Sequence, residues 1–333
     1  MLVPRYWAEH RIQLREDRGP QTTIRRWGWS GTSQAEADQH ARERAEAVAT
    51  EVRAGKTLSQ AQRRERKVAY NGADGLPIRE EILQDIPQFD AAITRNQYGA
   101  HCLNVRDVLF ADVDLAPTGQ FDGDIATGWL VVTSGCLALG GAAKYPDEAM
   151  IFVVVFVVMT VALVLWRGIK RLRQRLRLRS PDWISHRVEA WCAEHPSWSL
   201  HLYRTPAGYR LLATHALFAP SSAEVTDFFR FFKVDPLFAL MCVKQNCFRA
   251  RLTGKPWRMN VAGKMGWGTW PPTTPAAVAR RETWVAQYEQ VATVFAACRH
   301  LSRHGSTTEH PRAAEIRRIH DEACRALSDL PLA

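Results

Sequence analysis

The stretch LFADVDL, Leu109–Leu115, places two aspartates two positions apart in an apolar strand. Side chains alternate between the two faces of a strand, so Asp112 and Asp114 share one face. Two carboxylates this close repel each other unless a cation or an arginine lies between them. The pair favours a divalent-metal site with oxygen ligands, suited to Mg²⁺ or Mn²⁺. The alternative is a strand edge whose carboxylates pair with nearby arginines.

A long apolar segment follows this strand. Residues 149–166 are 18 residues without a charge, and at ~1.5 Å per residue they would span roughly 27 Å. Residues 125–143 are also uncharged and rich in small residues, which suits close helix packing in lipid. We therefore expect a transmembrane helical hairpin over residues 125–166. The alternatives are a buried core helix and insertion of the second segment alone.

The charge of the chain is unevenly distributed. Its net charge is +10, and residues 167–179 contain seven Arg or Lys and no acid. A basic flank belongs in the cytoplasm under the positive-inside rule, which predicts an inner-membrane protein whose soluble parts face the cytoplasm. The rest of the chain is only weakly basic, so its charge is poor evidence for a nucleic-acid groove.

Short patterns on either side of the predicted hairpin indicate an α+β fold, with a mixed or antiparallel sheet and flanking helices. Alternating residues predict strands in EHRIQLR and TTIRRWGWS, and Ser33 with Glu36 predicts the start of a helix that closes at Gly55. AHCLNVRDVLFADVDL predicts a β-hairpin around residues 106–107, and LHLYRTPAGYRLLATH predicts another around residues 206–208. Two helices are expected at the C-terminal side, over roughly 275–304 and 312–328.

The predicted organisation has eight parts. They are a strand–strand–helix segment (1–60), a polar connector (61–95), the first part of the α/β core with the D-x-D strand (96–124), the transmembrane hairpin (125–166), a basic juxtamembrane segment (167–180), the second part of the core (181–260), a Trp/Pro/Gly loop (261–275) and C-terminal helices (276–330).

Two resemblances follow from the motifs. Most of the soluble chain resembles a family of uncharacterised bacterial membrane-anchored proteins, through YRTPAGYRLLATH, CFRARLTGKPWR and a C-terminal HD. That resemblance implies no known activity. The order of a D-x-D strand, a glycine-centred hairpin, a later acid and a basic strand is also distantly similar to the archaeo-eukaryotic primase (primase-polymerase) superfamily.

The second resemblance implies metal-dependent nucleotidyl or phosphoryl transfer. In that family's pattern, Asp112, Asp114 and Asp235 are the catalytic carboxylates and hold the Mg²⁺ or Mn²⁺ ions. Basic residues would bind the nucleotide phosphates; these are Arg204, Arg210, Arg249, Arg251 and Lys255. The family's hairpin histidine falls on Arg210, which can hold a phosphate but cannot act as an imidazole.

This departure favours a degenerate site that binds a nucleotide, a nucleic acid or another phosphorylated ligand. The rival hypothesis is a non-enzymatic membrane-tethered interaction module in which the same charges form structural ion pairs.

Cysteine and histidine gather near the C-terminal side of the chain. His320 and Cys324 lie one helical turn apart, and Cys298 and His300 precede them. Such pairs can bind zinc, but their spacing fits no standard zinc module. The competing interpretation is surface histidines with core thiols. The chain has seven cysteines, an odd number without a regular framework, which indicates reduced thiols.

Overall fold

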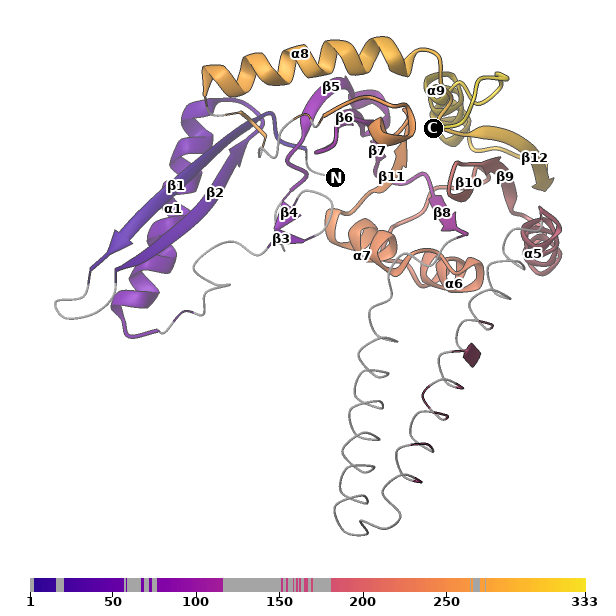
Figure 1. The fold of residues 1–333 in the computed structure, drawn as a ribbon, viewed down its shortest axis with the longest axis horizontal. Helices are drawn as coiled ribbons and strands as arrows, with labels where there is room; N and C mark the ends of the chain where they lie inside the picture. Colours follow the sequence, from indigo (N-terminus) through magenta and orange to yellow (C-terminus); the bar gives the residue numbers. More distant parts are fainter. Residues whose placement is uncertain are drawn as a thin grey trace. The chain divides into compact units, whose positions relative to one another are not determined.

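The computed structural model describes most of the chain outside its middle. The described residues are 3–15, 21–56, 58, 67–68, 72–73, 77–115, isolated positions between 151 and 169, 181–263, 265, 270–272 and 274–333. The chain divides into two compact units, one of Met1–Val113 with Trp191–Ala333 and one of Asp114–Ala190. Figure 1 shows an α+β fold, and every strand pair with a described register is antiparallel.

The N-terminal part forms the predicted strand–strand–helix segment. β1 (Tyr6–Leu14) pairs with β2 (Thr22–Ser30), and α1 (Gln34–Arg53) follows. Ser33 caps α1 by accepting the backbone N–H of Glu36, as its capping sequence predicts. The helix and the sheet approach closely, because a Cβ at Gly28 would lie 2.1 Å from the backbone nitrogen of Ala41. The buried face of α1 therefore consists of alanines, namely Ala37, Ala41, Ala45 and Ala49.

One four-stranded antiparallel sheet has the order β11-β7-β6-β5. Its strands are β5 (Glu81–Ile86), β6 (Ala91–Arg95), β7 (His101–Val105) and β11 (Phe248–Arg251). A short 3-10 helix, η1 (Pro87–Phe89), connects β5 to β6, and another, η3 (Pro256–Arg258), follows β11. Two short strands, β3 (Lys67–Val68) and β4 (Gly72–Ala73), pair with each other.

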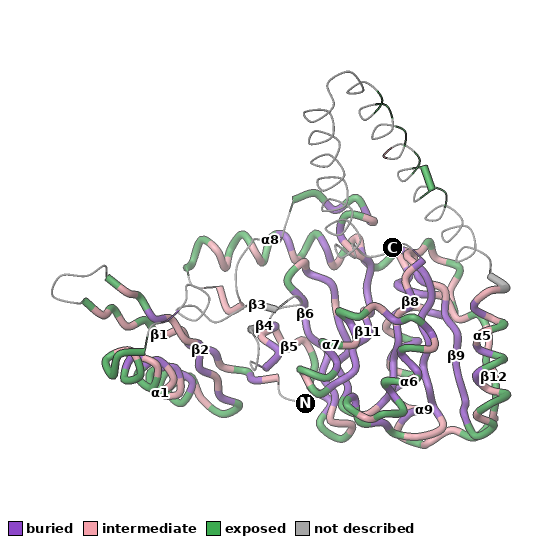
Figure 2. The backbone as a smooth tube through the Cα atoms, turned by 90° about the horizontal axis from the view of Figure 1, so that it is seen from below, coloured by how far each residue is buried: buried purple, intermediate pink, exposed green. Residues whose placement is uncertain are grey.

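A second four-stranded sheet has the order β12-β9-β10-β8. Its strands are β8 (Phe110–Asp114), β9 (Ser199–Arg204), β10 (Gly208–Ala213) and β12 (Arg299–Gly305). The hairpin predicted around residues 206–208 is confirmed by the antiparallel register of β9 and β10. Figure 2 shows β6, β8, β9 and β11 buried along most of their length, whereas α1, α8 and β12 carry many exposed residues.

Helices complete the fold. They are α5 (Pro181–Glu194), α6 (Ala223–Phe232), α7 (Pro236–Gln245), α8 (Pro275–Ala292) and α9 (Pro311–Cys324). Trp191 in the last turn of α5 packs edge-on against Phe228 of α6, which also stacks on Trp198. α9 lies against the second sheet, where the ring of His320 contacts Phe110 of β8 and Tyr203 of β9.

Two predicted elements outside residues 125–166 are wrong. The HCLNV and VLFADVDL segments do not form a hairpin, because β7 has β6 and β11 as its neighbours and β8 is a neighbour of β10 in the other sheet. The helix expected over 275–304 ends at Ala292. Residues 299–305 instead form β12, which pairs with β9 and completes the second sheet.

The fold class that included a transmembrane helical hairpin also needs correction. Among the described residues, none of the helices has both the length and the apolar character needed to cross a bilayer. The longest of them, α1 and α8, carry charged residues along their exposed faces, as expected of helices that bury only one side. Of the two predicted transmembrane segments, all of 125–143 and most of 149–166 lie outside the described residues.

Candidate functional site

Three buried side chains with metal-ligand atoms meet between α9 and the start of β12. They are Cys298, His320 and Cys324, named here the cysteine–histidine cluster, and one ligand atom from each lies within 4.8 Å of the others. None of the three has measurable solvent exposure. His320 and Cys324 lie one turn apart on α9, which directs both side chains to one face of the helix. Cys298 reaches them because the Ala297 N–H donates to the Cys324 carbonyl at 3.0 Å.

The imidazole of His320 is held at both nitrogens. Its Nδ1 lies 2.9 Å from the Asp321 carboxylate, and its Nε2 lies 3.1 Å from Nη1 of Arg210 and 3.8 Å from Sγ of Cys298. Burial lowers the pKa of His320, but the Cys298 sulfur and the Asp321 carboxylate raise it by more. A guanidinium can only donate, so the Arg210 contact is a hydrogen bond only when Nε2 is unprotonated. We therefore assign a neutral ring with its proton on Nδ1.

The two thiols of the cluster differ in their surroundings. A hydrogen bond from Cys324 lowers the pKa of Cys298 and outweighs the effect of burial, with further help from His320 and Arg210. Burial raises the pKa of Cys324 well above its ordinary value. The backbone carbonyl of Arg251 lies 3.5 Å from Sγ of Cys324 and is the alternative acceptor for the single proton of this thiol. Cys298 is thus the thiol that ionises more readily, because its partners favour the thiolate.

Arg210 links the cluster to the strand that carries the D-x-D motif. Its Nε and Nη2 donate to the two carboxylate oxygens of Asp112 at 2.7 and 3.1 Å, and its Nη1 donates to the Arg251 carbonyl at 2.9 Å. The Arg210 side chain is 1% exposed and that of Asp112 34%. Burial raises the pKa of Asp112, but the attraction of Arg210 lowers it by more. Asp112 is therefore ionised and serves as the counter-charge of a buried arginine.

A chain of ion pairs runs from the cluster along α9. Asp321 pairs with Arg317 at 3.4 Å, Arg317 with Glu309 at 3.3 Å, and Glu309 with Nε2 of His201 at 2.9 Å. Nδ1 of His201 lies 3.2 Å from Nε2 of His300. Burial lowers the pKa of His201 to about 4, although the Glu309 hydrogen bond opposes this. The cluster is thus one end of a polar layer between the second sheet and α9.

The other predicted carboxylates have separate positions. Asp114 is the last residue of β8. Asp235 is the N-cap of α7, where its side chain accepts the Leu237 N–H at 3.0 Å. Among the described residues, the group of three side chains with metal-ligand spacing is the cysteine–histidine cluster, which contains none of the predicted aspartates.

The predicted phosphate-binding cations have partners within the protein. Arg249 is buried and pairs with the buried Glu80 at 2.7 Å. Arg251 donates from Nη1 to the backbone carbonyl oxygens of Thr253 and Ala333 at 3.0 and 3.1 Å.

Two further cations of this set lie against aromatic rings. Arg204 lies over the ring of Tyr209 at 4.8 Å, and Lys255 lies 5.4 Å from the ring of Trp257. The described contacts of all five cations are thus to groups of the chain itself.

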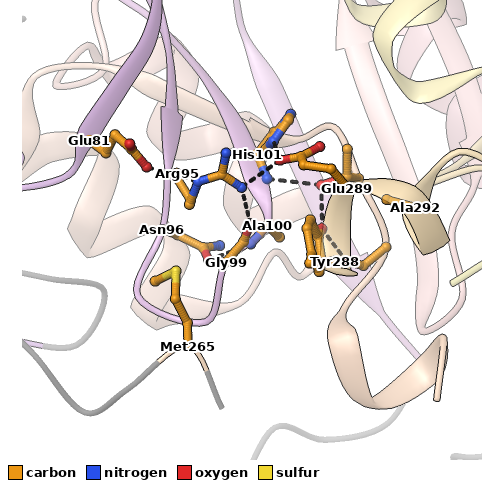
Figure 3. Close-up of polar contacts among 12 residues, drawn as sticks. Glu81, Arg95, Asn96, Gly99, Ala100, His101, Met265, Tyr288, Glu289 and Ala292 are labelled. Carbon is orange, nitrogen blue, oxygen red and sulfur yellow. Dashed lines mark hydrogen bonds and ion pairs between the residues drawn. The ribbon is translucent and has the colours of Figure 1, made fainter. Parts of the chain in front are cut away.

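A second polar region joins β5, β6 and β7 to α8 (Figure 3). It consists of Glu81, Arg95, His101, Tyr288 and Glu289, and is named here the α8 network. Arg95 donates to Glu81 at 2.8 Å and to Glu289 at 2.7 Å, and Nε2 of His101 contacts the same Glu289 oxygen at 2.7 Å. The hydroxyl of Tyr288 donates to the Gly254 carbonyl at 2.8 Å. These contacts fasten α8 to the first sheet.

Sequence reasoning identified the parts of the cluster but not the whole. The four-residue spacing of His320 and Cys324 was visible on the predicted helix. The sequence places Cys298 in the same cysteine- and histidine-rich region, but the helix predicted over 275–304 runs through it and gives no reason for it to meet the other two. The HD pair, His320–Asp321, was noted only as part of a family resemblance. In the structure, the Asp321 carboxylate of this pair lies 2.9 Å from Nδ1 of the His320 imidazole.

Comparisons of the chain with protein-family models, with curated proteins and with solved structures gave no match. The primase-polymerase resemblance therefore stays a prediction based on motif order.

Proposed function

We propose that this chain is a zinc-binding protein in which Cys298, His320 and Cys324 hold the ion. The observation that carries the proposal is the convergence of two thiols and one imidazole nitrogen within 4.8 Å in a buried position. Thiolate and imidazole are the ligands that zinc prefers, and ligand atoms around a tetrahedral zinc ion lie about 3.5–4 Å apart, given bond lengths of 2.0–2.3 Å. The Cys298 Sγ to His320 Nε2 distance of 3.8 Å fits this spacing.

The second support is the orientation of the histidine. In zinc sites the imidazole nitrogen that does not bind the metal usually donates to a carboxylate, which fixes the tautomer and makes the ligand more basic. Nδ1 of His320 has such a partner in Asp321 at 2.9 Å. The remaining nitrogen, Nε2, lies 3.8 Å from the Cys298 sulfur and accepts the Arg210 hydrogen bond.

The third support is the charge balance. Each cysteine gives up one proton when it binds a metal, so one Zn²⁺ replaces two protons and leaves the net charge of the cluster unchanged. Arg210 opposes the binding of a cation, and the ion must also replace the Arg210 hydrogen bond to Nε2. Arg210 keeps its contacts with Asp112 and with the Arg251 carbonyl. Three protein ligands leave the fourth position of a tetrahedral ion to a water molecule.

The proposal is tested by metal titration of the reduced, metal-free full chain. Zinc is titrated in competition with a chromophoric chelator, and cobalt(II) is added separately to record thiolate-to-metal charge-transfer absorption. We expect a single ion per chain, and loss of both signals in Cys298→Ser and Cys324→Ser. The matched control is Cys242→Ser, which removes another buried thiol outside the cluster.

A conservative variant covers the case in which a ligand variant does not fold. Asp321→Asn keeps all three ligands, and we expect zinc affinity to fall by about 10- to 100-fold, as for other outer-shell partners. A folded chain that binds no zinc, or one whose zinc affinity is the same in wild type, Asp321→Asn and the cysteine variants, would overturn the proposal. The cluster would then be a polar part of the core.

A further inference from the structure

We infer that Cys298 and Cys324 also form a reversible redox pair, in which a hydroperoxide converts the two thiols to a disulfide and so expels the metal ion. This regulation of the site rests on the proposed zinc binding for its metal-release step, whereas the disulfide step rests on the thiols alone. A disulfide removes two of the three ligands at once, because neither sulfur then carries a thiolate charge.

The backbone brings the two thiols together and holds them there. Cys298 precedes β12 and Cys324 ends α9. The Ala297 N–H donates to the Cys324 carbonyl at 3.0 Å, and the His300 N–H donates to the Ala326 carbonyl at 2.9 Å. One of these bonds starts at the residue before Cys298, and the other joins residues two positions after each cysteine, so the two backbone segments are held side by side. The two sulfurs lie within 4.8 Å, so a small side-chain movement brings them to the ~2.05 Å of an S–S bond.

The neighbours of the two sulfurs assign different roles to them. Sγ of Cys298 lies 3.8 Å from Nε2 of His320. Sγ of Cys324 lies 3.5 Å from the backbone carbonyl of Arg251. We assign Cys298 as the attacking sulfur and Cys324 as the resolving sulfur, because Cys298 is the one that lies beside an imidazole.

The chemistry balances with hydrogen peroxide as the oxidant. The Cys298 thiolate attacks one peroxide oxygen, an S–O bond forms, the O–O bond breaks, and the leaving hydroxide takes up a proton to give water. The Cys324 sulfur then attacks the sulfenic acid of Cys298, the S–S bond forms, the S–O bond breaks, and the departing hydroxide takes up a second proton to give water. The two protons are those of the thiols in the metal-free chain; in the zinc-loaded chain they would come from solvent, because both sulfurs would already be thiolates. The two sulfurs lose two electrons and one peroxide gains them.

The chain contains a control pair. Cys242 and Cys247 are also buried, and the Cys247 N–H donates to the Cys242 carbonyl at 3.1 Å. Burial raises the pKa of both thiols, that of Cys247 to about 12. Their hydrogen bonds in the described part of the chain include no histidine side chain. If burial alone decided reactivity, the Cys242 and Cys247 thiols would oxidise as readily as those of Cys298 and Cys324.

The experiment treats the zinc-loaded full chain with limiting hydrogen peroxide. Released zinc is followed with a chromophoric chelator, and disulfides are mapped by peptide mass spectrometry. We expect a peptide pair linked through Cys298 and Cys324, zinc release in step with it, and full reversal by dithiothreitol. Oxidation of this pair should be at least about ten-fold faster than loss of the Cys242 and Cys247 thiols, because the two sulfurs of this pair lie within 4.8 Å and that of Cys298 has an imidazole nitrogen 3.8 Å away.

Two variants complete the test. In Cys324→Ala the sulfenic acid of Cys298 has no resolving partner, so it should accumulate and react with a sulfenic-acid-specific probe. In Cys298→Ser no linked peptide should form. The inference is overturned if oxidation links Cys242 to Cys247 as readily, or if Cys324→Ala gives no more sulfenic acid than wild type. A chain that forms the Cys298–Cys324 link but never binds zinc would contradict the proposed function and leave the redox pair intact.

Discussion

The cysteine–histidine cluster, taken with its neighbours Arg210 and Asp321, and the α8 network each combine an arginine, a histidine and a carboxylate. The two regions differ in burial and in the presence of sulfur atoms. His320 has no solvent exposure and Arg210 has 1%, whereas Glu289 is 40% exposed and His101 22%. In the α8 network the carboxylate is the acceptor for both Arg95 and His101 (Figure 3). In the other region the Asp321 carboxylate contacts Nδ1 of His320, and the sulfurs of Cys298 and Cys324 lie within 4.8 Å of a nitrogen of the same ring. The same residue types thus attach a helix to a sheet in one region, and in the other they surround the two thiols that we propose bind zinc.

The largest expected effect concerns the buried charge of Arg210. Asp112→Ala leaves this guanidinium without its counter-charge, so the free energy of unfolding should fall by about 3 kcal/mol, at the lower end of the range for a broken buried pair, because water reaches the partly exposed Asp112 position. Urea unfolding measures the change. Arg106→Ala, which breaks the exposed pair with Asp90, is the control and should cost less than about 1 kcal/mol. Equal losses in the two variants would contradict the burial argument.

The second effect is stabilisation by zinc. A ligand that binds only the folded state at 100 times its Kd adds about 2.7 kcal/mol to the free energy of unfolding. Zinc should therefore raise the Tm of the wild-type chain and leave that of Cys298→Ser unchanged. Glu289→Gln, which alters only the α8 network, should keep the full zinc response. A zinc response that disappears in Glu289→Gln and persists in Cys298→Ser would contradict the assignment of the zinc site to the cysteine–histidine cluster.

The third effect tests the α8 network as an anchor. Glu289→Gln weakens the contacts with Arg95 and His101, and we expect the free energy of unfolding to fall by about 1 kcal/mol, since water partly replaces the lost interaction. Glu282→Gln is the control on the exposed face of the same helix, and it should change stability by less than about 0.5 kcal/mol. Chemical unfolding at neutral pH compares them. Identical stabilities would show that the network contributes nothing.

The smallest effect is a pH dependence. Burial raises the pKa of Glu289, but His101 and Arg95 lower it by more, so its folded pKa lies below the ordinary 4.5. A lowered folded pKa means that Glu289 contributes stability above pH 4.5, and that this contribution disappears as pH falls through the folded value. The stability difference between wild type and Glu289→Gln should therefore shrink below pH 4.5. A difference that stays constant as the pH falls would contradict this account.

Local signals in the sequence predicted several elements correctly. Alternating residues predicted β1 and β2, the Ser33 cap predicted α1, and the turn at residues 206–208 predicted the β9–β10 hairpin. Each of these depends on residues close together in the chain. The pairing of Asp112 with an arginine was one of the alternatives for the D-x-D strand, and the structure identifies that arginine as Arg210.

Long-range pairing defeated the same signals elsewhere. The pattern around residues 106–107 is that of a hairpin, but β7 and β8 belong to different sheets. The helix predicted over 275–304 includes most of β12, whereas residues 299–305 pair with β9 as a strand. In both cases the strand partner comes from a distant part of the chain. The tertiary contacts with that partner override the local secondary-structure preference.

The sequence by itself determined the types of secondary structure and the kinds of side chain available for a site. It predicts strands whose polar residues alternate between the two faces, and a helix that carries His320 and Cys324 on one face. It also contains the arginines and acids that could form ion pairs. Only the tertiary structure decided which of these meet. Arg210 and Asp112 are 98 residues apart and Cys298 and His320 are 22 apart. They converge because α9 packs against the second sheet while β12 pairs with β9. Packing and strand pairing join distant segments, and neither is encoded in any short stretch.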